Sequence, residues 1–296
     1  MDKTYHFRIA DLGIKIVFRG ERGNSLQLIP SFLPFLEEKE TDDRLFSLTV
    51  DDSLMPCPKA QREHIRDFDT GNGMTFVDRL ENGGYQYIIR DVEGHDCCLL
   101  ITNGDFTDCR CALNGNYNMR CFGLNNALML AFAFAGSLRQ CLLIHASLVR
   151  QDDYGYAFVA KSGTGKSTQV SMWLRYLPNC DLMNDDNPII RIIDGKPYIY
   201  GGPWSGKTPC YRRTKAQLGA ITSIVRSETN FVDKLGPIQA FATLLPSCST
   251  MKWDVKTYSK TCDTITQVVE TTKIYALHCL PNPEAALICN KTIKVK

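Results

Sequence analysis

Apolar and polar residues alternate along the first part of the chain, in short runs that are rich in β-branched and aromatic side chains. Alternation with a period of two is typical of strands that bury one face. Turn-forming pairs such as Asn72-Gly73 and Glu93-Gly94 separate several of these runs, which indicates antiparallel hairpins. The predicted strands are residues 7–9, 14–18, 46–50, 74–77, 85–89, 97–101 and 108–112.

This first part contains one candidate helix, residues 25–36, which Pro30 and Pro34 interrupt. We therefore expect a smaller, mostly β N-terminal domain over residues 1–117. It contains no recognisable catalytic constellation, and a role in packing or in presenting a substrate fits it equally well. Residues 118–140 are expected to form a connecting helix. Its apolar positions are Leu124, Leu128, Leu130, Ala131, Phe134 and Leu138.

From residue 141 onward, predicted strands and helices interleave, which is typical of an α/β domain. The turn pair Asp194-Gly195 adds a hairpin to it. The predicted strands are residues 141–150, 156–160, 181–183, 189–193, 198–201, 220–226 and 274–279, and the predicted helices are residues 168–177, 237–245, 254–270 and 283–289. The first of these helices has Val170, Trp173, Leu174 and Leu177 on one face.

Residues 160–167 read A-K-S-G-T-G-K-S, a glycine-rich turn between a predicted strand and a predicted helix. Glycines permit backbone angles that turn successive N–H groups into one concave nest for phosphate oxygens. Lys166 adds a mobile positive charge for the β- and γ-phosphates, and Ser167 is placed to bind Mg²⁺. The alternative is a structural glycine turn. The expected nucleotide-binding residues are Ser162, Gly163, Thr164, Gly165, Lys166, Ser167 and Thr168.

Two adjacent acids, Asp185 and Asp186, end an apolar segment 19 positions beyond Lys166. That spacing leaves room for a helix and for a return strand lying beside the strand that enters the loop. Both acids would then reach the same edge of the sheet as the loop, where phosphoryl-transfer enzymes place a metal ligand and a base. The alternative is a polar turn before Pro188.

A third polar segment follows at residues 201–207, G-G-P-W-S-G-K. Trp204 is suited to covering a planar or apolar group. Lys207, with Arg212 and Arg213, supplies cations for phosphoryl oxygens or an acidic substrate, although these side chains fit ordinary solvated charges equally well. His145 has two readings as well, a core histidine on a buried strand or a member of the site.

The segments I-H-A-S-L-V (residues 144–149), A-K-S-G-T-G-K-S and N-D-D (residues 184–186) together resemble the C-terminal kinase domain of bacterial HPr serine kinases and their uncharacterised relatives. That domain is itself similar to the nucleotide core of phosphoenolpyruvate carboxykinase. The resemblance covers residues 141–205. It implies a mixed-sheet P-loop nucleotide domain over residues 141–296, and an active centre in which His145 is the strand histidine, Lys166 and Ser167 are loop ligands, and Asp185 and Asp186 are the acid pair.

The chain also departs from that family. The acid-x-Arg-Gly-x-Gly run expected after the Asp-Asp strand is missing, and residues 201–207 stand in its place. HPr is therefore not the expected substrate. The substrate-binding residues of the carboxykinase have no counterpart here either, so its decarboxylating chemistry is not expected. A homo-oligomer follows only by analogy with relatives.

These features predict an ATP-dependent kinase that phosphorylates a hydroxyl, of a serine in a protein or peptide or of a small molecule. The expected catalytic residues are Asp185, Asp186, His145 and Lys207. Asp185 is the expected proton acceptor, and Ser167 and Asp186 the expected Mg²⁺ ligands, although the two acids can exchange these roles. The alternative is a nucleotide-binding regulatory or assembly protein with little turnover.

The composition limits which partners and which cellular location are expected. The formal charge is +2, from 34 basic and 32 acidic residues that are mixed along the chain, so a nucleic-acid partner is not expected. The longest apolar stretch, residues 127–136 and loosely extended to 138, is far shorter than the roughly twenty residues needed to cross a bilayer. Thirteen cysteines without a signal peptide or a C-x-x-C pair indicate reduced thiols in a cytoplasmic protein, and Cys97-Cys98 and Cys109-x-Cys111 fit buried positions better than a metal site.

Overall fold

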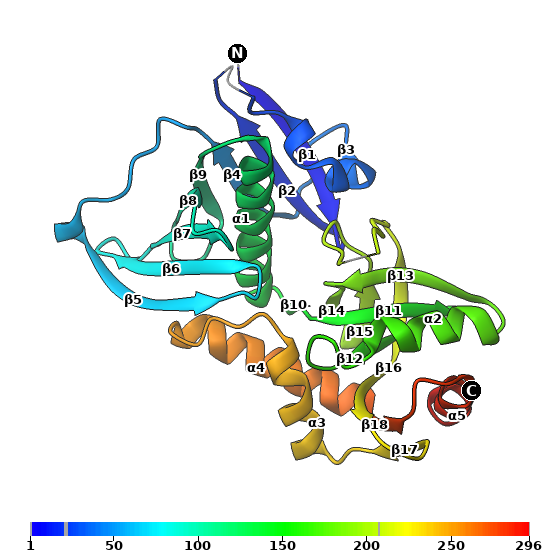
Figure 1. Cartoon of the computed structure of the whole chain (residues 1–296). Helices are drawn as coiled ribbons and strands as arrows, with labels where there is room; N and C mark the ends of the chain where they lie inside the picture. Colours follow the sequence, from blue (N-terminus) through cyan, green and yellow to red (C-terminus); the bar gives the residue numbers. More distant parts are fainter. Residues whose placement is uncertain (1, 21–22, 207, 296) are drawn as a thin grey trace. The chain divides into compact units, whose positions relative to one another are not determined.

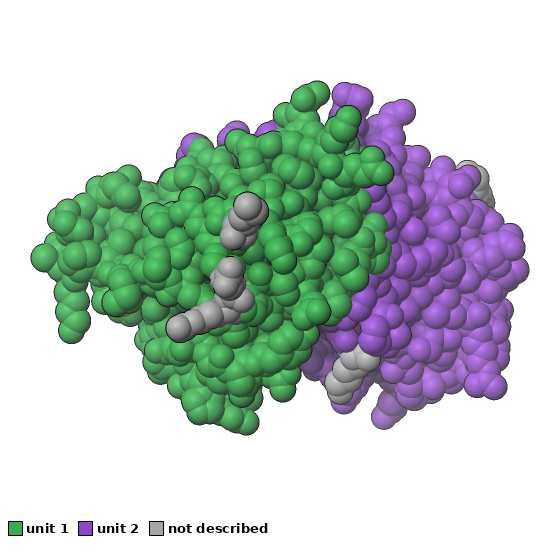
Figure 2. Space-filling model, turned by 90° about the horizontal axis from the view of Figure 1, so that it is seen from above, with its two compact units in different colours: residues 1–136 green, residues 137–296 purple. Residues whose placement is uncertain are grey.

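The computed structural model describes residues 2–20, 23–206 and 208–295. The chain forms two compact units, residues 1–136 and residues 137–296 (Figure 2). Helix α1 (Tyr117–Ser137), expected to connect two domains, falls almost entirely within the first unit. None of the helices in the described ranges is long and apolar enough to cross a membrane.

The first unit is built on a nine-stranded sheet of order β3-β1-β2-β4-β9-β8-β7-β6-β5 (Figure 1). All seven strands predicted in this part are confirmed, while β3 and β5 were not predicted. The strands are β1 (Lys3–Ile9), β2 (Leu12–Phe18), β3 (Leu36–Glu37), β4 (Arg44–Val50), β5 (Arg62–Asp69), β6 (Gly73–Leu80), β7 (Tyr85–Asp91), β8 (Asp96–Thr102) and β9 (Asp108–Leu113).

The antiparallel hairpins expected at the glycine-containing turns are confirmed, but the middle of this sheet also contains parallel pairs that were not predicted. Strands β5 to β9 do form an antiparallel meander, and β1 pairs with β2 in the same way. However, β4 runs parallel to both β2 and β9. Parallel neighbours need a crossover connection, and the chain between β2 and β4 is long enough to provide one.

The sheet of the first unit curves around α1 (Figure 1). Gly123 permits a close approach, because a Cβ there would lie 2.7 Å from the carbonyl oxygen of Cys97 on β8. Phe134 of α1 meets Phe106 edge to face, with 5.2 Å between the ring centroids. The predicted helix over residues 25–36 is instead two short 3₁₀ helices, η1 (Leu26–Leu28) and η2 (Pro30–Phe35), because the prolines lack the N–H groups that an α-helix needs. A third, η3, spans Lys59–Gln61.

The second unit also has nine strands, in the order β10-β14-β15-β16-β12-β11-β13, with β18 paired to β16 and β17 to β18. The strands are β10 (Cys141–Leu143), β11 (Ala146–Gln151), β12 (Tyr154–Val159), β13 (Cys180–Asp186), β14 (Ile189–Ile193), β15 (Lys196–Tyr200), β16 (Lys215–Arg226), β17 (Phe231–Lys234) and β18 (Lys273–Cys279). The helices are α2 (Lys166–Tyr176), α3 (Pro237–Leu244), η4 (Leu245–Ser247), α4 (Val255–Thr271) and α5 (Pro283–Ile293).

Helices cover both faces of this second sheet, so its strands are apolar on both sides. Along β12, Tyr156 and Phe158 pack with Trp173 of α2, and the alternate residues Ala157 and Val159 join the cluster that contains residues of α3 and α4. The predicted apolar face of α2 is confirmed for Val170 and Trp173, which are buried. It is wrong for Leu174, which is 38% exposed.

Strands β12, β16 and β18 run parallel to one another. Strand β13 points the same way as β12, because β11 lies between them and is antiparallel to both. The carboxyl ends of these four strands therefore meet at one edge of the sheet. This is the edge at which ligands bind in open α/β sheets.

Candidate functional site

The glycine-rich segment forms a tight turn between β12 and α2. The φ angles of Gly163 and Gly165 are 75° and 128°, a region that L side chains rarely adopt. Helix α2 begins at Lys166, directly after the turn, so its free N–H groups and dipole favour a bound anion. The other residues predicted in the turn, Ser162, Thr164, Ser167 and Thr168, flank the glycines and are at least partly exposed.

Lys166 turns back toward the strand edge. Its side chain is only 8% exposed, and its Nζ donates to the carbonyl oxygen of Ala160 at 3.1 Å. The same Nζ lies 2.7 Å from Nε2 of His145. Burial lowers the pKa of Lys166, while the carboxylates of Asp186 and Asp185 oppose that shift. A buried ammonium is thus held ready for anionic oxygens.

His145 sits in a break of the predicted strand 141–150, which divides into β10 and β11. Its backbone N–H donates to the carbonyl oxygen of Ser247, at 2.7 Å. Burial and the charge of Lys166 lower the pKa of His145, against the opposing effect of Asp186. A neutral imidazole ring can accept a hydrogen bond from the Lys166 ammonium at Nε2. The same Nε2 lies 3.6 Å from Oδ1 of Asp186. The structure therefore brings His145 to the loop and the acids.

The acid pair ends β13, as expected, but the prediction that this strand lies directly beside β12 is wrong. Strand β11 is inserted between them. In the register of β11 and β13, Ser147 lies opposite Asp185 and Ala146 lies opposite Asp186. The register continues to Leu148, opposite Asn184, and then shifts at a bulge between Leu148 and Val149. The insertion places a β11 side chain between the loop and the acids.

That side chain is Ser147, for which the sequence pattern predicted no role. Its Oγ donates to Oδ1 of Asp185 at 2.6 Å, and Oγ of Ser167 donates to the same oxygen at 2.9 Å. Ser147 is fully buried and Asp185 is 5% exposed. The available sequence signal was one small polar residue, two positions after His145, in the otherwise apolar run of residues 146–149. The loop hydroxyl and the first acid thus form one hydrogen-bonded group.

Asp186 is more open than Asp185, with 36% of its side chain exposed. Its φ is 141°, a conformation that costs a non-glycine residue energy and that persists only where the surroundings hold it. The side-chain amide of Asn187 donates to its Oδ2 at 2.7 Å. Ser205 forms an isolated bridge with Asp186, and the N–H of Gly206 donates to the carbonyl oxygen of Asp185. Residues 205 and 206 therefore support the acid pair.

Trp204, Arg212 and Arg213 were also expected to contribute to this third part of the site. Trp204 is 2% exposed, so the expectation that it covers a bound planar group is wrong, and its carbonyl oxygen accepts from Nδ2 of Asn184 at 2.9 Å. Arg212 forms an ion pair with Asp181, which lies at the other end of β13 from the acids. Arg213 is exposed, and Lys207 lies outside the described residues.

Replacing Ser147 with alanine should lower the free energy of unfolding by about 1–3 kcal/mol, because a buried carboxylate loses a charge-assisted hydrogen bond. Urea unfolding monitored by circular dichroism measures this change. The matched control is Ser171→Ala, at an exposed position of α2, which should stay within about 0.5 kcal/mol of the wild type. Equal stability of the two variants would contradict the structural role given to Ser147.

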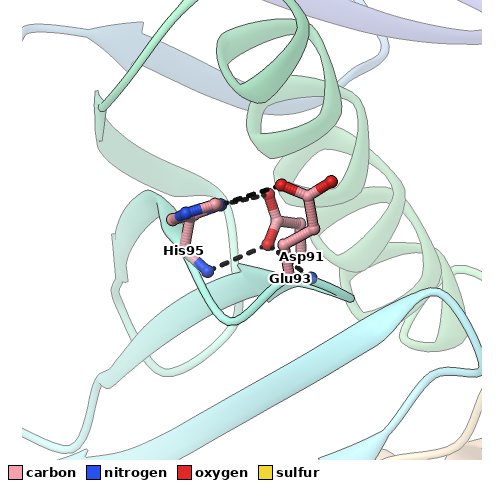
Figure 3. Close-up of side chains that lie close together, drawn as sticks. All are labelled: Asp91, Glu93 and His95. Atoms are coloured by element: carbon pink, nitrogen blue, oxygen red, sulfur yellow. Dashed lines mark hydrogen bonds and ion pairs between the residues drawn. The ribbon is translucent and has the colours of Figure 1, made fainter.

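A second group of ligating side chains lies in the first unit, at the β7–β8 turn (Figure 3). Asp91 Oδ1 accepts from the backbone N–H groups of Glu93 and His95, at 3.0 and 2.9 Å. The ring of His95 lies 3.3 Å from the other carboxylate oxygen of Asp91. These hydrogen bonds, that of the His95 N–H above all, lower the pKa of Asp91. The hydrogen bonds among Asp91, Glu93 and His95 are those of a side chain that stabilises a turn, and they explain why these residues lie together.

No protein-family model and no curated protein matches the sequence. The second unit brings together a glycine turn at a helix N-terminus, a buried lysine, a hydroxyl bonded to a buried acid, and a second, more open acid beside a histidine.

Proposed function

We propose that the chain is a Mg²⁺- and ATP-dependent phosphotransferase that phosphorylates a hydroxyl group, built on a P-loop domain of the HPr kinase and phosphoenolpyruvate carboxykinase type. The observation that carries this proposal is the hydrogen bond of 2.9 Å from Ser167 to Asp185. In P-loop enzymes, a loop serine or threonine and an aspartate at the end of a neighbouring strand hold the metal together. A glycine turn with only a structural role would need neither the hydroxyl of Ser167 nor the carboxylate of Asp185.

The residues present fit Mg²⁺, which prefers carboxylate and hydroxyl oxygens together with water. Asp185 and Ser167 would hold the ion, and Ser147 would keep the carboxylate of Asp185 in place through its bond of 2.6 Å. When bound, the ion would neutralise charge on the β- and γ-phosphates. This assignment exchanges the roles expected from the sequence, because Asp185 is the buried acid in contact with the loop hydroxyl.

Asp186 is the acid we assign as the base. It is partly exposed, so an acceptor can reach it, and His145 lies 3.6 Å away. The hydroxyl oxygen of the acceptor would form a bond to the γ-phosphorus as its proton passes to Asp186. The bond from the γ-phosphorus to the bridging oxygen would break, and ADP would leave with the electron pair. Lys166 would offset the negative charge of the phosphoryl oxygens.

The test is phosphoryl transfer by the full chain, with γ-labelled ATP and pools of serine-containing peptides and of small alcohols. We expect Mg²⁺-dependent ADP release that an acceptor pool stimulates, and label that appears on a hydroxyl of the acceptor. Mass spectrometry then identifies the phosphorylated product. Tight ATP binding without ADP release or transferred label, with or without acceptors, would contradict the enzyme and favour a nucleotide-binding regulator.

A further inference from the structure

The glycine-rich loop has a largely exposed tip, residues 161–164, that one side chain ties to the rest of the second unit. Within the tip, the N–H of Thr164 donates to the carbonyl oxygen of Lys161, at 3.2 Å. From outside the loop, Nη2 of Arg226 donates to the carbonyl oxygen of Gly163, at 2.7 Å. No other segment in the described part of the chain forms a hydrogen bond with these four residues.

Arg226 has a fixed backbone and an open side chain. It is the last residue of β16 and pairs in parallel register with Cys279 of β18, and the next N–H, that of Ser227, donates to the Cys279 carbonyl oxygen at 3.2 Å. The exposed side chain and Gly163 both line a cavity of about 390 Å³. None of the described residues that line this cavity is acidic, so no carboxylate there competes with the Gly163 carbonyl for the guanidinium. The bond therefore joins the loop tip to the edge of the sheet.

This bond fixes the orientation of one peptide unit in the loop. The carbonyl of Gly163 and the N–H of Thr164 belong to the same planar trans peptide, so they point in opposite directions. Arg226 holds the carbonyl, and the carbonyl oxygen of Lys161 holds the N–H. The chain then passes through Gly165 into α2, whose first N–H groups have no partner within the helix. Arg226 thus helps to set the course of the backbone whose N–H groups would meet phosphate.

Without Arg226, the loop tip would keep only the turn bond between Thr164 and Lys161. A tip that contains glycine has many accessible backbone conformations, because glycine populates positive and negative φ almost equally. A ligand that binds a mobile loop must supply the free energy of ordering it, whereas a loop held in its bound shape avoids that cost. A tether present before binding therefore raises the affinity for any ligand that the loop holds.

We propose that Arg226 is a positioning residue for phosphate binding. Through the carbonyl of Gly163, it holds the loop in the shape that accepts phosphate before any ligand binds. It acts through the loop backbone and neither touches the phosphates nor selects a base. The inference rests on the proposed function, because it assumes that the loop holds the phosphates of the nucleotide. It adds a residue from a different strand to the loop motif.

Replacing Arg226 with methionine removes the bond to Gly163. With Mg²⁺ present, the affinities for ATP and for inorganic tripolyphosphate should fall by the same factor, about tenfold, because both ligands must then order the loop tip. Calorimetry measures both dissociation constants. The control Arg175→Met removes the same charge at an exposed position in the last turn of α2 and should leave both constants unchanged. Unchanged affinities in Arg226→Met, or a loss for ATP alone, would overturn the inference. If the wild type bound neither ligand, the proposed function itself would fail.

Amide hydrogen exchange separates this positioning role from direct contact between Arg226 and phosphate. Without ligand, the backbone amides of residues 163–167 should exchange at least about threefold faster in Arg226→Met than in the wild type, because the loop opens more often. With saturating Mg-ATP, the two proteins should exchange at equal rates, because bound phosphate then holds the loop. Equal exchange without ligand would overturn the inference even if the affinities fall. Amides of α4, far along the chain from the loop, should exchange equally in both proteins and serve as the control for folding.

Discussion

Replacing Asp186 with asparagine should slow phosphoryl transfer by about 10²- to 10⁴-fold, the range typical of losing a general base, while Mg-ATP affinity stays within about twofold. Asparagine has nearly the same shape but cannot take the acceptor proton. It also tolerates a positive φ better than most residues, so the φ of 141° at this position should persist. Single-turnover transfer of labelled phosphate measures the rate, and calorimetry measures the affinity.

The matched variant is Asp185→Asn, which changes the neighbouring acid in the same way. It should raise the Mg²⁺ concentration needed for half-maximal activity by about tenfold or more, because a neutral amide is a poorer ligand for a hard cation. ATP binding without Mg²⁺ should change little. If Asp186→Asn shifts the Mg²⁺ dependence and Asp185→Asn does not, the two roles are the reverse of our assignment. Full activity in both variants would contradict phosphoryl transfer at this site.

The strands that the sequence predicted well are those with a buried face. In β7 and β8, residues such as Tyr87, Ile89 and Leu100 alternate with more polar ones or form apolar runs, so their pattern predicts a strand whatever lies next to it. Strand β5 reads R-E-H-I-R-D-F-D, is largely exposed and sits at the edge of its sheet. Strand β5 forms because it pairs with β6, and a local run of mostly charged residues does not predict such a pairing.

The candidate site was predictable where its chemistry is local in sequence. Lys166 and Ser167 belong to one short motif, and the acids Asp185 and Asp186 are adjacent to each other. The chain length between the loop and the acids was enough to predict that they lie at the same edge of the sheet. The predicted strand order was wrong, because β11 and not β13 lies beside β12. Which strand pairs with which depends on the whole sheet. The contribution of Ser147 could not be derived without the register that sets it opposite Asp185.

The roles of the two acids show the same limit. In sequence, Asp185 and Asp186 are neighbours with no feature that separates them. In the folded chain, Asp185 is 5% exposed and accepts from two hydroxyls, whereas 36% of the Asp186 side chain is open. Burial and hydrogen bonding, which divide the work between paired carboxylates, come from the tertiary structure. The sequence could name both residues but could not assign their roles.

Replacing Lys166 with methionine should weaken Mg-ATP binding by about 10- to 100-fold, because the phosphates lose a charge-assisted contact. In the nucleotide-free protein at neutral pH, the same change should make the fold more stable. Burial lowers the pKa of Lys166 from its ordinary value of 10.5, so the folded chain holds this proton less tightly than the unfolded chain does. The charge therefore opposes folding until phosphate binds.

The stability gained in Lys166→Met should depend on pH, because the pKa of Lys166 is lowered in the folded chain. Between the lowered pKa and 10.5, the unfolded chain binds more protons at Lys166 than the folded chain, so this residue makes wild-type stability rise with pH. The advantage of Lys166→Met should be full below this window and shrink as the pH rises through it. Urea unfolding at pH 7 and at pH 10.5, without nucleotide, measures both values. Lys273→Met, at an exposed position of β18, should show no such dependence. Two results would contradict the idea that the buried ammonium of Lys166 destabilises the nucleotide-free fold. One is a lower free energy of unfolding in Lys166→Met than in the wild type at pH 7, and the other is an equal gain at both pH values.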